Sequence, residues 1–526
     1  MLKPFSLTSL LLTAWLALAT LPACSDNIQP EYNVKLLALP GQTPLTGATS
    51  VSLEAVGSGL QTTVAVTAGQ LPTLSLRGLD SRKVKAATFV VKVNGPQGLI
   101  AYGRSPRIRL VNQTIQLFVL VQTLGSLASA SEDPLIPRLA DGAVVTAAIK
   151  EPEEPQAVAV PVILGGKTIN TAGNEEPTRV AVLYNPYLHA VVTPNLFTAT
   201  ATGAAVLARA DGTIWFFGGR TEGPPLTFSG VANQIGTDQL LNEVTMGLTA
   251  TYTPAPEATQ VPREGAVLAE VPVAGAAVLL AFGGQTVPDS TMPAAVKTLS
   301  SVVLINPALA AGVVSLFGPS MLAPRSGHTA TVINVNVPPT ATAPAVLRTD
   351  VLLFGGTFDP AGPVAEVYDA TLGQFAALAD AGPPRVNHAV LALPDGRQLI
   401  VGGVDASGVP IADVRIYEPL SRTFTPFALP LQRPRSGAAI FVLGNDLVVC
   451  GGLDATNAPV PDAERFDLAT LAPLPALPAA PRTGAKVAYL PDGTALLIGG
   501  RAPDAGGLRP TSTIEVYRPR DVPAAP

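Results

Sequence analysis

The sequence predicts an all-β chain whose larger part is a seven-bladed β-propeller, preceded by a small antiparallel β-sandwich. An apolar run that ends in a glycine pair occurs seven times, and this internal repeat is the first observation that predicts the propeller. Two further sequence marks recur in register with the glycine pair, which is the second observation. Residues 31–122 lack the pair and alternate apolar with polar residues between turns, which predicts the sandwich.

The glycine pairs mark the end of one short strand in each repeat. Their spacing is nearly constant over the last four repeats and longer before them, which predicts loop insertions in the earlier repeats. Glycine suits these positions because the strand must turn sharply where neighbouring blades crowd together, and a Cβ atom would clash there. The seven pairs end at Gly166, Gly219, Gly284, Gly356, Gly403, Gly452 and Gly500.

Each repeat carries a second mark before the glycine pair and a third mark after it. A Pro-Arg dipeptide precedes six of the seven pairs, and an apolar segment that ends in Tyr, Phe or Ile follows each pair. Together with hairpin turns such as Asp395-Gly396, these marks predict four short antiparallel strands per repeat. The six arginines are Arg138, Arg263, Arg325, Arg385, Arg435 and Arg482.

The three marks together resemble the kelch repeat over residues 123–526. The resemblance rests on the glycine pair, the Tyr that follows it and the Pro-Arg dipeptide. It departs at the fourth strand, where kelch repeats usually carry Trp and this chain carries Phe375, Phe424 and Leu471. The resemblance implies a kelch-like propeller of the galactose-oxidase-like superfamily.

The two ends of the repeat region are predicted to pair with each other. The last repeat ends soon after Tyr517 without an evident fourth strand. Leu127 precedes Arg138 by the same interval at which Phe424 precedes Arg435. We therefore predict that residues near 123–129 form the outer strand of the seventh blade and close the ring, since an open sheet edge invites aggregation.

The first 23 residues predict a bacterial lipoprotein signal peptide. An apolar run from Leu10 to Leu18 is too short to span a bilayer, and it leads to the sequence LPAC, which resembles a lipobox ending in Cys24. We expect a lipid on Cys24 to anchor the chain to the outer membrane, with residues 24–30 as a linker and the rest in the periplasm or on the cell surface. The alternative is an ordinary cleaved signal followed by a chance cysteine.

The overall charge argues against a nucleic-acid partner. The chain has 33 Lys and Arg against 38 Asp and Glu, which gives a formal net charge of −5, and no basic block stands out. Apolar residues make up 47% of the chain and charged residues only 13%, which allows a large core. We expect no nucleic-acid binding.

The sequence predicts no catalytic residue, metal or cofactor. The copper radical site of galactose-oxidase-like enzymes needs two His, two Tyr and a Cys. This chain has three histidines, namely His189, His328 and His388. Cys450 lies inside an apolar strand, where it is expected to act as a small buried hydrophobic residue, so we predict no copper site. His328 and His388 stand at equivalent places in adjacent repeats, but the third ligand that a metal site needs is not evident.

Three aspartates follow glycine pairs at similar offsets: Asp405, Asp454 and Asp504. Asp side chains commonly accept hydrogen bonds from the backbone of tight turns, so turn formation is the first interpretation. Calcium binding through carboxylate oxygens is the alternative.

The Pro-Arg residues supply the candidate binding rim. Loops that join the second strand to the third emerge on the same face of a four-stranded meander as the connections between blades, so the arginines share a face with a long loop from Arg220 to about Leu241. Six arginines there, with His328 and His388, could bind acidic peptides or sugars. Alternatively, each arginine ties adjacent blades together through buried hydrogen bonds, as a repeat-wide position suggests.

The sequence thus predicts a membrane-anchored, extracytoplasmic binding or scaffold protein that presents a kelch-like propeller to a protein or glycan. An enzymatic role is the less favoured interpretation; it would be a carbohydrate-active enzyme, epimerase-like or oxidase-like, at the propeller mouth. The predicted immunoglobulin-like sandwich at 31–122 serves either as a spacer or as a binding module, since fold alone does not imply function.

Overall fold

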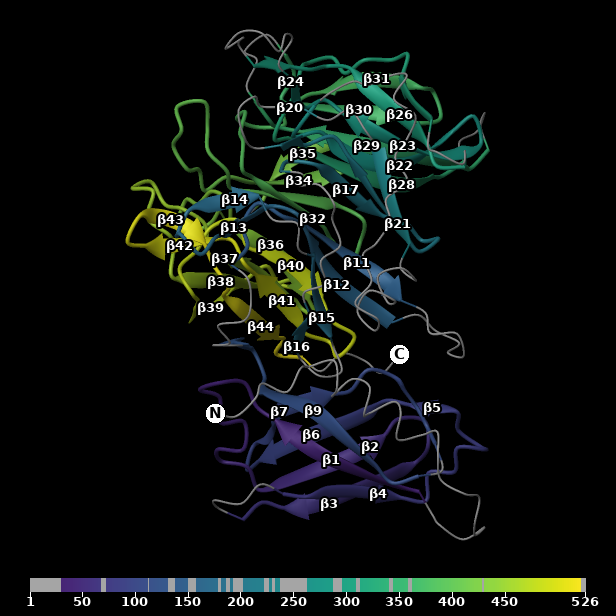
Figure 1. Cartoon of the computed structure of the whole chain (residues 1–526), viewed down its shortest axis with the longest axis vertical. Helices are drawn as coiled ribbons and strands as arrows, with labels where there is room; N and C mark the ends of the chain where they lie inside the picture. The colour runs from purple at the N-terminus through teal and green to yellow at the C-terminus, as the bar shows by residue number, and fades with distance from the viewer. Residues whose placement is uncertain are drawn as a thin grey trace.

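The structure is a computed structural model, and it describes residues 30–67, 72–111, 113–130, 138–149, 158–177, 181–185, 190–192, 202–221, 227–228, 232–236, 263–286, 296–308, 313–339, 344–357, 362–427 and 430–521. These residues form strands, turns and bridges, with no helix among them. No helix long and apolar enough to cross a membrane is therefore found in the described part of the chain. Figure 1 shows the N-terminal strands as one body and the later strands as a larger, ring-like body.

The N-terminal body is one seven-stranded sheet in the order β3-β2-β6-β7-β9-β1-β4. Strand β1 pairs antiparallel with β4 on one side and parallel with β9 on the other, and the two edge strands β3 and β4 lie against each other. The sheet is therefore nearly closed, like a barrel. Its strands are β1 (Glu31–Leu37), β2 (Ser50–Ala55), β3 (Leu60–Ala65), β4 (Leu74–Arg77), β6 (Phe89–Gly95), β7 (Gly98–Arg104) and β9 (Ile115–Thr123), beside the short pair β5 (Ala86–Ala87) and β8 (Ile108–Arg109).

The predicted two-sheet sandwich is not confirmed, although the predicted alternation of residues is present. In β2, Val51, Leu53 and Ala55 point into the core while the residues between them are partly exposed. Tyr32 is fully buried, and its hydroxyl donates to the carbonyl oxygen of Val111 at 2.7 Å. The sandwich prediction missed the parallel pairing of β1 with β9, which joins what would be two sheets into one.

Six four-stranded antiparallel sheets make up most of the ring, and we name each sheet by its innermost strand. In five of them the four strands follow one another along the chain from the innermost to the outermost. In the sixth, the outermost strand lies before all the other strands of the ring in the sequence. The six sheets are β11 (Ala143–Ile149), β12 (Val158–Leu164), β15 (Ala181–Asn185), β16 (Ala190–Val192); β22 (Val267–Val273), β23 (Ala276–Phe282), β26 (Val302–Asn306), β27 (Val313–Leu316); β28 (Thr329–Val337), β29 (Val346–Phe354), β30 (Ala365–Asp369), β31 (Gln374–Leu378); β32 (Ala389–Ala392), β33 (Gln398–Val401), β34 (Val414–Glu418), β35 (Thr423–Pro426); β36 (Ala439–Leu443), β37 (Asp446–Cys450), β38 (Asp462–Asp467), β39 (Pro473–Pro478); and β40 (Lys486–Tyr489), β41 (Ala495–Ile498), β44 (Ile514–Arg518), β10 (Ser126–Ser129).

A three-stranded sheet stands between the β11 and β22 sheets. It consists of β17 (Ala205–Ala208), β18 (Thr213–Phe217) and β21 (Ala232–Gly236), and its inner strand β17 lies against both β11 and β22. At the other end of the series, β40 lies against β11. The arrangement is propeller-like, but seven complete blades are not confirmed because only three strands of this sheet are described.

Strand β10 connects the N-terminal body to the ring. It follows β9 after a two-residue turn and pairs antiparallel with β44, with Leu127 opposite Tyr517. Phe424 stands opposite Tyr417 in the β32 sheet in the same way. At this junction Gln122 is fully buried and donates to the carbonyl oxygen of Val516 at 3.0 Å.

Four of the sheets carry an extra two-stranded hairpin after the glycine pair. These sheets are consecutive around the arrangement, running from β40 through β11 and β17 to β22. Figure 1 shows two of the hairpins, β13–β14 and β42–β43, side by side. The hairpins are β13 (Lys167–Ile169) with β14 (Glu175–Pro177), β19 (Arg220–Thr221) with β20 (Thr227–Phe228), β24 (Gln285–Thr286) with β25 (Lys297–Thr298), and β42 (Arg501–Asp504) with β43 (Gly507–Pro510).

Candidate functional site

The Pro-Arg residues and the glycine pairs meet at the junctions between sheets. The second glycine of a pair donates its N–H to the carbonyl oxygen of the arginine in the next sheet, as Gly403 does to Arg435 at 3.0 Å. The guanidinium of Arg435 then donates to the carbonyl oxygen of Gly451, the first glycine of its own sheet, at 3.1 Å. Each such arginine therefore links two successive glycine pairs, and we call this end of the ring the glycine-pair face.

The same pattern recurs around the ring. The N–H of Gly219, Gly284, Gly356 and Gly452 donates to the carbonyl oxygen of Arg263, Arg325, Arg385 and Arg482, respectively. The guanidinium groups of Arg263, Arg325 and Arg385 likewise donate to the carbonyl oxygens of Gly283, Gly355 and Gly402.

The pattern explains why glycine is required at these positions. Gly355 adopts a φ of 65°, and a Cβ atom there would lie 2.5 Å from the carbonyl oxygen of Arg385. A contact of that length with backbone cannot be relieved by moving a flexible side chain. The glycine pair is thus a point at which the backbones of neighbouring blades are in direct contact.

Five of the six predicted rim arginines are buried and do not line an exposed rim. Arg263, Arg325, Arg385, Arg435 and Arg482 are all at most 3% exposed. Three of them form ion pairs with a glutamate of the third strand: Arg325 with Glu366, Arg435 with Glu464, and Arg482 with Glu515. Burial lowers the pKa of Arg263 to about 10. These side chains stabilise the blade junctions, which is the second of the two alternatives raised by the sequence.

Arg138 differs from the other five. Its side chain is exposed and forms an ion pair with Asp504 at 2.8 Å. The equivalent of the buried arginine is instead the next residue, Leu139, whose carbonyl oxygen accepts the N–H of Gly500 at 2.8 Å. Since Leu139 has no donor side chain, the junction that closes the ring has the backbone contact without the guanidinium.

His328 and His388 occupy equivalent positions and are both buried. Burial, with smaller contributions from nearby arginines, lowers the pKa of each to about 3, so both imidazoles are neutral near pH 7. His388 Nε2 lies 3.1 Å from Thr329 Oγ1, and its ring packs edge-on against Phe354. Within the described residues no group of three or more His, Cys, Asp or Glu side chains could hold a metal ion.

The β32 sheet departs from the arginine–glutamate pairing. At the third-strand position of Glu366, Glu464 and Glu515 this sheet has Arg415. Arg385 pairs instead with Asp413, which also accepts from Arg415 Nε at 3.1 Å. Burial opposes ionisation of Asp413, but hydrogen bonds from both arginines hold its pKa below the usual value.

Beside Arg415 the glycine-pair face is hollowed. A cavity of about 400 Å³ opens there, and its lining consists of Val364, Leu378, Asp380, Ala381, Gly382 and Arg415. Gly382 packs on the guanidinium so closely that a Cβ atom would lie 2.8 Å from Arg415 Nε. The cavity thus forms where the repeat exchanges a buried carboxylate for a partly exposed cation.

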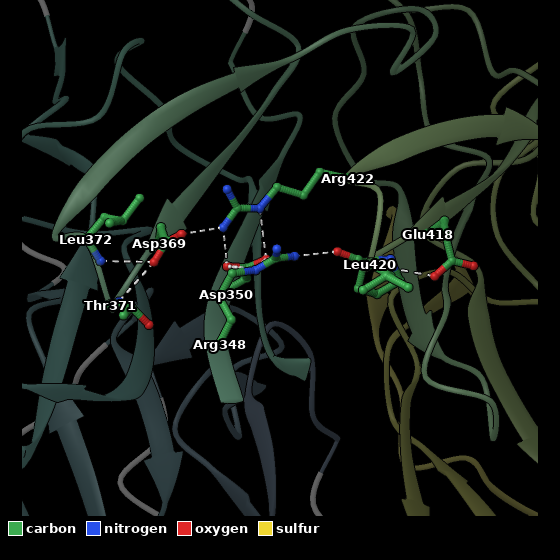
Figure 2. Close-up of polar contacts among 9 residues, drawn as sticks. Arg348, Asp350, Asp369, Thr371, Leu372, Glu418, Leu420 and Arg422 are labelled. Carbon is green, nitrogen blue, oxygen red and sulfur yellow. Dashed lines mark hydrogen bonds and ion pairs between the residues drawn. The ribbon is translucent and has the colours of Figure 1, made fainter. Parts of the chain in front are cut away.

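Ionic contacts also join the sheets at the opposite face. Figure 2 shows Arg422, from the turn between β34 and β35, reaching across to the carboxylates of Asp350 and Asp369 in the neighbouring β28 sheet. Arg348 completes the group through Asp350 and the carbonyl oxygen of Pro419. Burial raises the pKa of Asp369, but the hydrogen bond from Arg422 lowers it, and overall the pKa of this carboxyl lies below its usual value.

An equivalent ionic contact joins the β36 and β40 sheets. Arg520 pairs with Asp446 at 2.6 Å and with Asp467 at 2.9 Å, and Tyr517 donates its hydroxyl to Asp446. Between these two junctions, Leu471 occupies the turn position of Arg422. A mainly apolar cavity of about 140 Å³ lies there between the β32 and β36 sheets. This junction is therefore apolar where the other two are ionic, and it has Arg397 at the acceptor position of Asp350 and Asp446.

The predicted turn-forming aspartates behave as turn formers. Asp405 Oδ1 accepts the N–H groups of Ser407 and Val409, and Asp454 Oδ1 accepts those of Thr456 and Ala458. Asp504 accepts the N–H of Ala505 and pairs with Arg138. The first interpretation from the sequence therefore accounts for these carboxylates.

Two other predicted residues lie outside the described part of the chain, namely Cys24 and His189. Cys450 is buried, and burial raises the pKa of its thiol to about 12. It fills an apolar position in β37, as the sequence predicted.

One kelch motif is recognised in the chain by comparison with known families. The Kelch motif family matches residues 434–471, which include Arg435, β36, β37, the glycine pair and β38. No curated protein matches the chain. The motif and the propeller-like arrangement support a kelch-repeat β-propeller.

The glutamates that partner the buried arginines were missed by the sequence analysis. They follow a simple pattern, because each stands two residues before the aromatic residue of the third strand, as in Glu366-Val-Tyr368. The same spacing places Arg415 before Tyr417. The glutamates and the arginine that replaces them in the β32 sheet could therefore have been found from their spacing to the aromatic residue.

Proposed function

We propose that this chain is a lipid-anchored, extracytoplasmic binding or scaffold protein that presents the glycine-pair face of its kelch-repeat propeller to a protein partner. Kelch propellers generally mediate protein binding. The observation that carries the choice of face is the cavity of about 400 Å³ at Arg415, and the same face has two exposed apolar side chains, Leu322 at 50% and Val409 at 49% exposure. Exposed apolar side chains on a rigid framework are typical of protein interfaces.

The rigidity of this face supports the proposal. The buried arginines hold the glycine-pair ends of successive blades together through the backbone. Arg435, for example, is fully buried and donates to Gly451, Asp462 and Glu464. A partner that docks on such a face loses little affinity to ordering of the receptor.

Capture of the partner from envelope extracts tests the choice of face. We expect a protein that co-purifies with the wild-type chain to be lost with the double variant Leu322→Asp/Val409→Asp. It should be retained by Leu372→Asp/Leu420→Asp, which changes two leucines of 67% and 48% exposure in turns on the opposite face. Equal recovery with both variants, or no specific partner with the wild type, contradicts the proposal.

Anchoring through Cys24 is a separate part of the proposal, and it rests on the LPAC sequence after the apolar run. Palmitate should label the wild-type chain in cells, and the label should disappear in Cys24→Ser. The same variant should move the protein from the membrane fraction to the soluble fraction. Labelling that persists in Cys24→Ser contradicts the lipid anchor.

We also propose that the ring has seven blades over residues 123–526, with the strand near 123–129 as the outer strand of the last. The position of the β17 sheet between β11 and β22 supports the count, and the pairing of Leu127 with Tyr517 supports the closure. Replacing Leu127 by Asp should lower the melting temperature markedly. An unchanged melting temperature contradicts the closure.

A further inference from the structure

At one position of the third strand, three sheets of the ring carry a glutamate, the β11 and β22 sheets carry Val182 and Val303, and the β32 sheet carries a cation. In the β28, β36 and β40 sheets, the third strand carries a buried glutamate that pairs with the buried arginine of the junction: Glu366, Glu464 and Glu515. Each glutamate also accepts a backbone N–H from the loop before that arginine, as Glu366 does from Leu322 at 2.6 Å. The β32 sheet has Arg415 in this position. An arginine side chain has no acceptor, so it can accept neither the bond from the junction arginine nor the backbone N–H bond.

The exchange leaves donors of Arg415 unused. Its Nε donates to both carboxylate oxygens of Asp413, at 3.2 and 3.1 Å. No hydrogen bond from its two terminal nitrogens is found among the residues that the structure describes. The side chain is 20% exposed, whereas the glutamates in this position are at most 5% exposed as whole residues. A guanidinium with free terminal donors is suited to a carboxylate, which it binds in a bidentate manner.

These free donors lie at a cavity. The cavity of about 400 Å³ on the glycine-pair face has Arg415 as its one cationic lining residue, within the part of the chain that the structure describes. A Cβ atom at Gly382 would lie 2.8 Å from Nε and 3.1 Å from Cζ of Arg415, so a larger residue there would displace the guanidinium. Arg385 and Arg415 together face Asp413, so the group carries one uncompensated positive charge, with Asp380 at the exposed wall of the cavity.

We propose that the Arg415 cavity takes a carboxylate side chain, Asp or Glu, from the protein partner. This inference rests on the proposed function and adds the chemistry of the partner to it. A cation at a position where three other sheets form an internal ion pair is a local departure of the kind expected where function constrains the sequence. The arginine proposed here for binding, Arg415, is not one of the six Pro-Arg residues.

The chain itself offers the decisive variant. Arg415→Glu introduces the residue type found in three other sheets, so the introduced carboxylate can pair with Arg385 and the variant should fold with an equal or higher melting temperature. Binding is measured by fluorescence anisotropy of fluorescein-labelled hexaglutamate at low salt, with labelled hexaglutamine as the neutral probe. We expect Arg415→Glu and Arg415→Gln to weaken hexaglutamate binding about tenfold or more, the effect of losing one charge-assisted contact.

Matched controls separate a specific site from general charge. Arg433→Gln removes a 58% exposed arginine at the next junction and should change hexaglutamate binding by less than about twofold. Asp380→Asn removes the negative charge at the cavity wall and should tighten binding. Equal losses in Arg415→Gln and Arg433→Gln, or weaker binding in Asp380→Asn, overturn the proposal.

Other outcomes identify other ligands and overturn the proposal as well. Wild-type protein that binds inorganic phosphate or heparin through Arg415, but not hexaglutamate, indicates a free anion or a sulfated glycan. Capture of the native partner distinguishes the carboxylate contact at Arg415 from the proposed protein-binding function. A partner lost with Leu322→Asp/Val409→Asp but retained by Arg415→Glu refutes the carboxylate contact and leaves the proposed function standing, whereas the absence of any specific partner refutes the proposed function.

Discussion

Replacing Arg435 by Met tests whether the repeated arginines hold the blades together. Arg435 is fully buried, and it donates to the carbonyl oxygens of Gly451 and Asp462 and to the carboxylates of Asp462 and Glu464. Met retains the length of the aliphatic stem and removes every donor. Glu464, which is 5% exposed, is then left buried without its cation.

The expected cost follows from that uncompensated charge. Removing one partner of a buried ion pair destabilises a protein by about 3–5 kcal/mol, since the remaining charge stays out of water. Arg433→Met is the matched control two residues away. Arg433 is 58% exposed and pairs with Asp462 at 3.0 Å, so its loss should cost about 0–1 kcal/mol. Adding Glu464→Gln to Arg435→Met should recover part of the loss, because no buried charge then remains.

Hydrogen exchange of the β36 and β37 amides measures the effect locally. In a repeat structure, a single blade junction can open without global unfolding, so the free energy of local opening is a sharper measure than one melting temperature. We expect the opening free energy to fall by about 3–5 kcal/mol in Arg435→Met and to be nearly unchanged in Arg433→Met. Values within about 1 kcal/mol of each other refute the structural role of the buried arginine.

Three further predictions follow from other described residues. Gly403→Ala should lower the melting temperature far more than Gly408→Ala. Both glycines have a positive φ, but only at Gly403 would the new Cβ contact backbone, at 2.7 Å from the carbonyl oxygen of Val386. Equal shifts in melting temperature would show that this backbone contact is unimportant. His328 and His388 have folded-state pKa values of about 3, below the unfolded value of about 6.5. Protonation therefore favours the unfolded chain, so the free energy of unfolding should be highest above about pH 6.5 and fall steadily toward pH 3. The urea midpoint of His328→Phe/His388→Phe should depend less on pH in this window. A double variant whose urea midpoint depends on pH as the wild type's does would argue against buried neutral histidines. Cys450 is buried with a thiol pKa raised to about 12, so in Cys24→Ser protein it should react with iodoacetamide only after denaturation; rapid labelling of the native protein contradicts its burial.

The repeat made much of the ring predictable. Glycine pairs, hairpin turns and apolar segments are local patterns, and Gly212, Gly396 and Gly493 all adopt the positive φ that their Asp-Gly turns predict. Equal spacing also pointed to the segment that contains β10, because Leu127 stands opposite Tyr517 as Phe424 stands opposite Tyr417. These features depend on residues close in sequence or on an exact repetition of them.

Other features depended on contacts that no local pattern reports. The parallel pairing of β1 with β9 joins residues far apart in sequence, and it made a nearly closed sheet of what alternation alone predicted as a sandwich. The shift from Arg138 to Leu139 is a one-residue change of register, visible only in the bond from Gly500. The fate of the arginines was open for the same reason, since Pro-Arg recurs whether the side chain points to solvent or into the junction.

Many of the ring's strands, turns and glycine pairs could be read from the amino-acid sequence, because each follows from backbone geometry within one repeat. What the junction residues do depends on how the blades pack. Bringing one blade against the next buries Arg435 beside Glu464, which makes it structural, and leaves Arg415 of the preceding blade with free donors at a cavity. The two arginines differ in burial and in available acceptors, and these are properties of the packed ring.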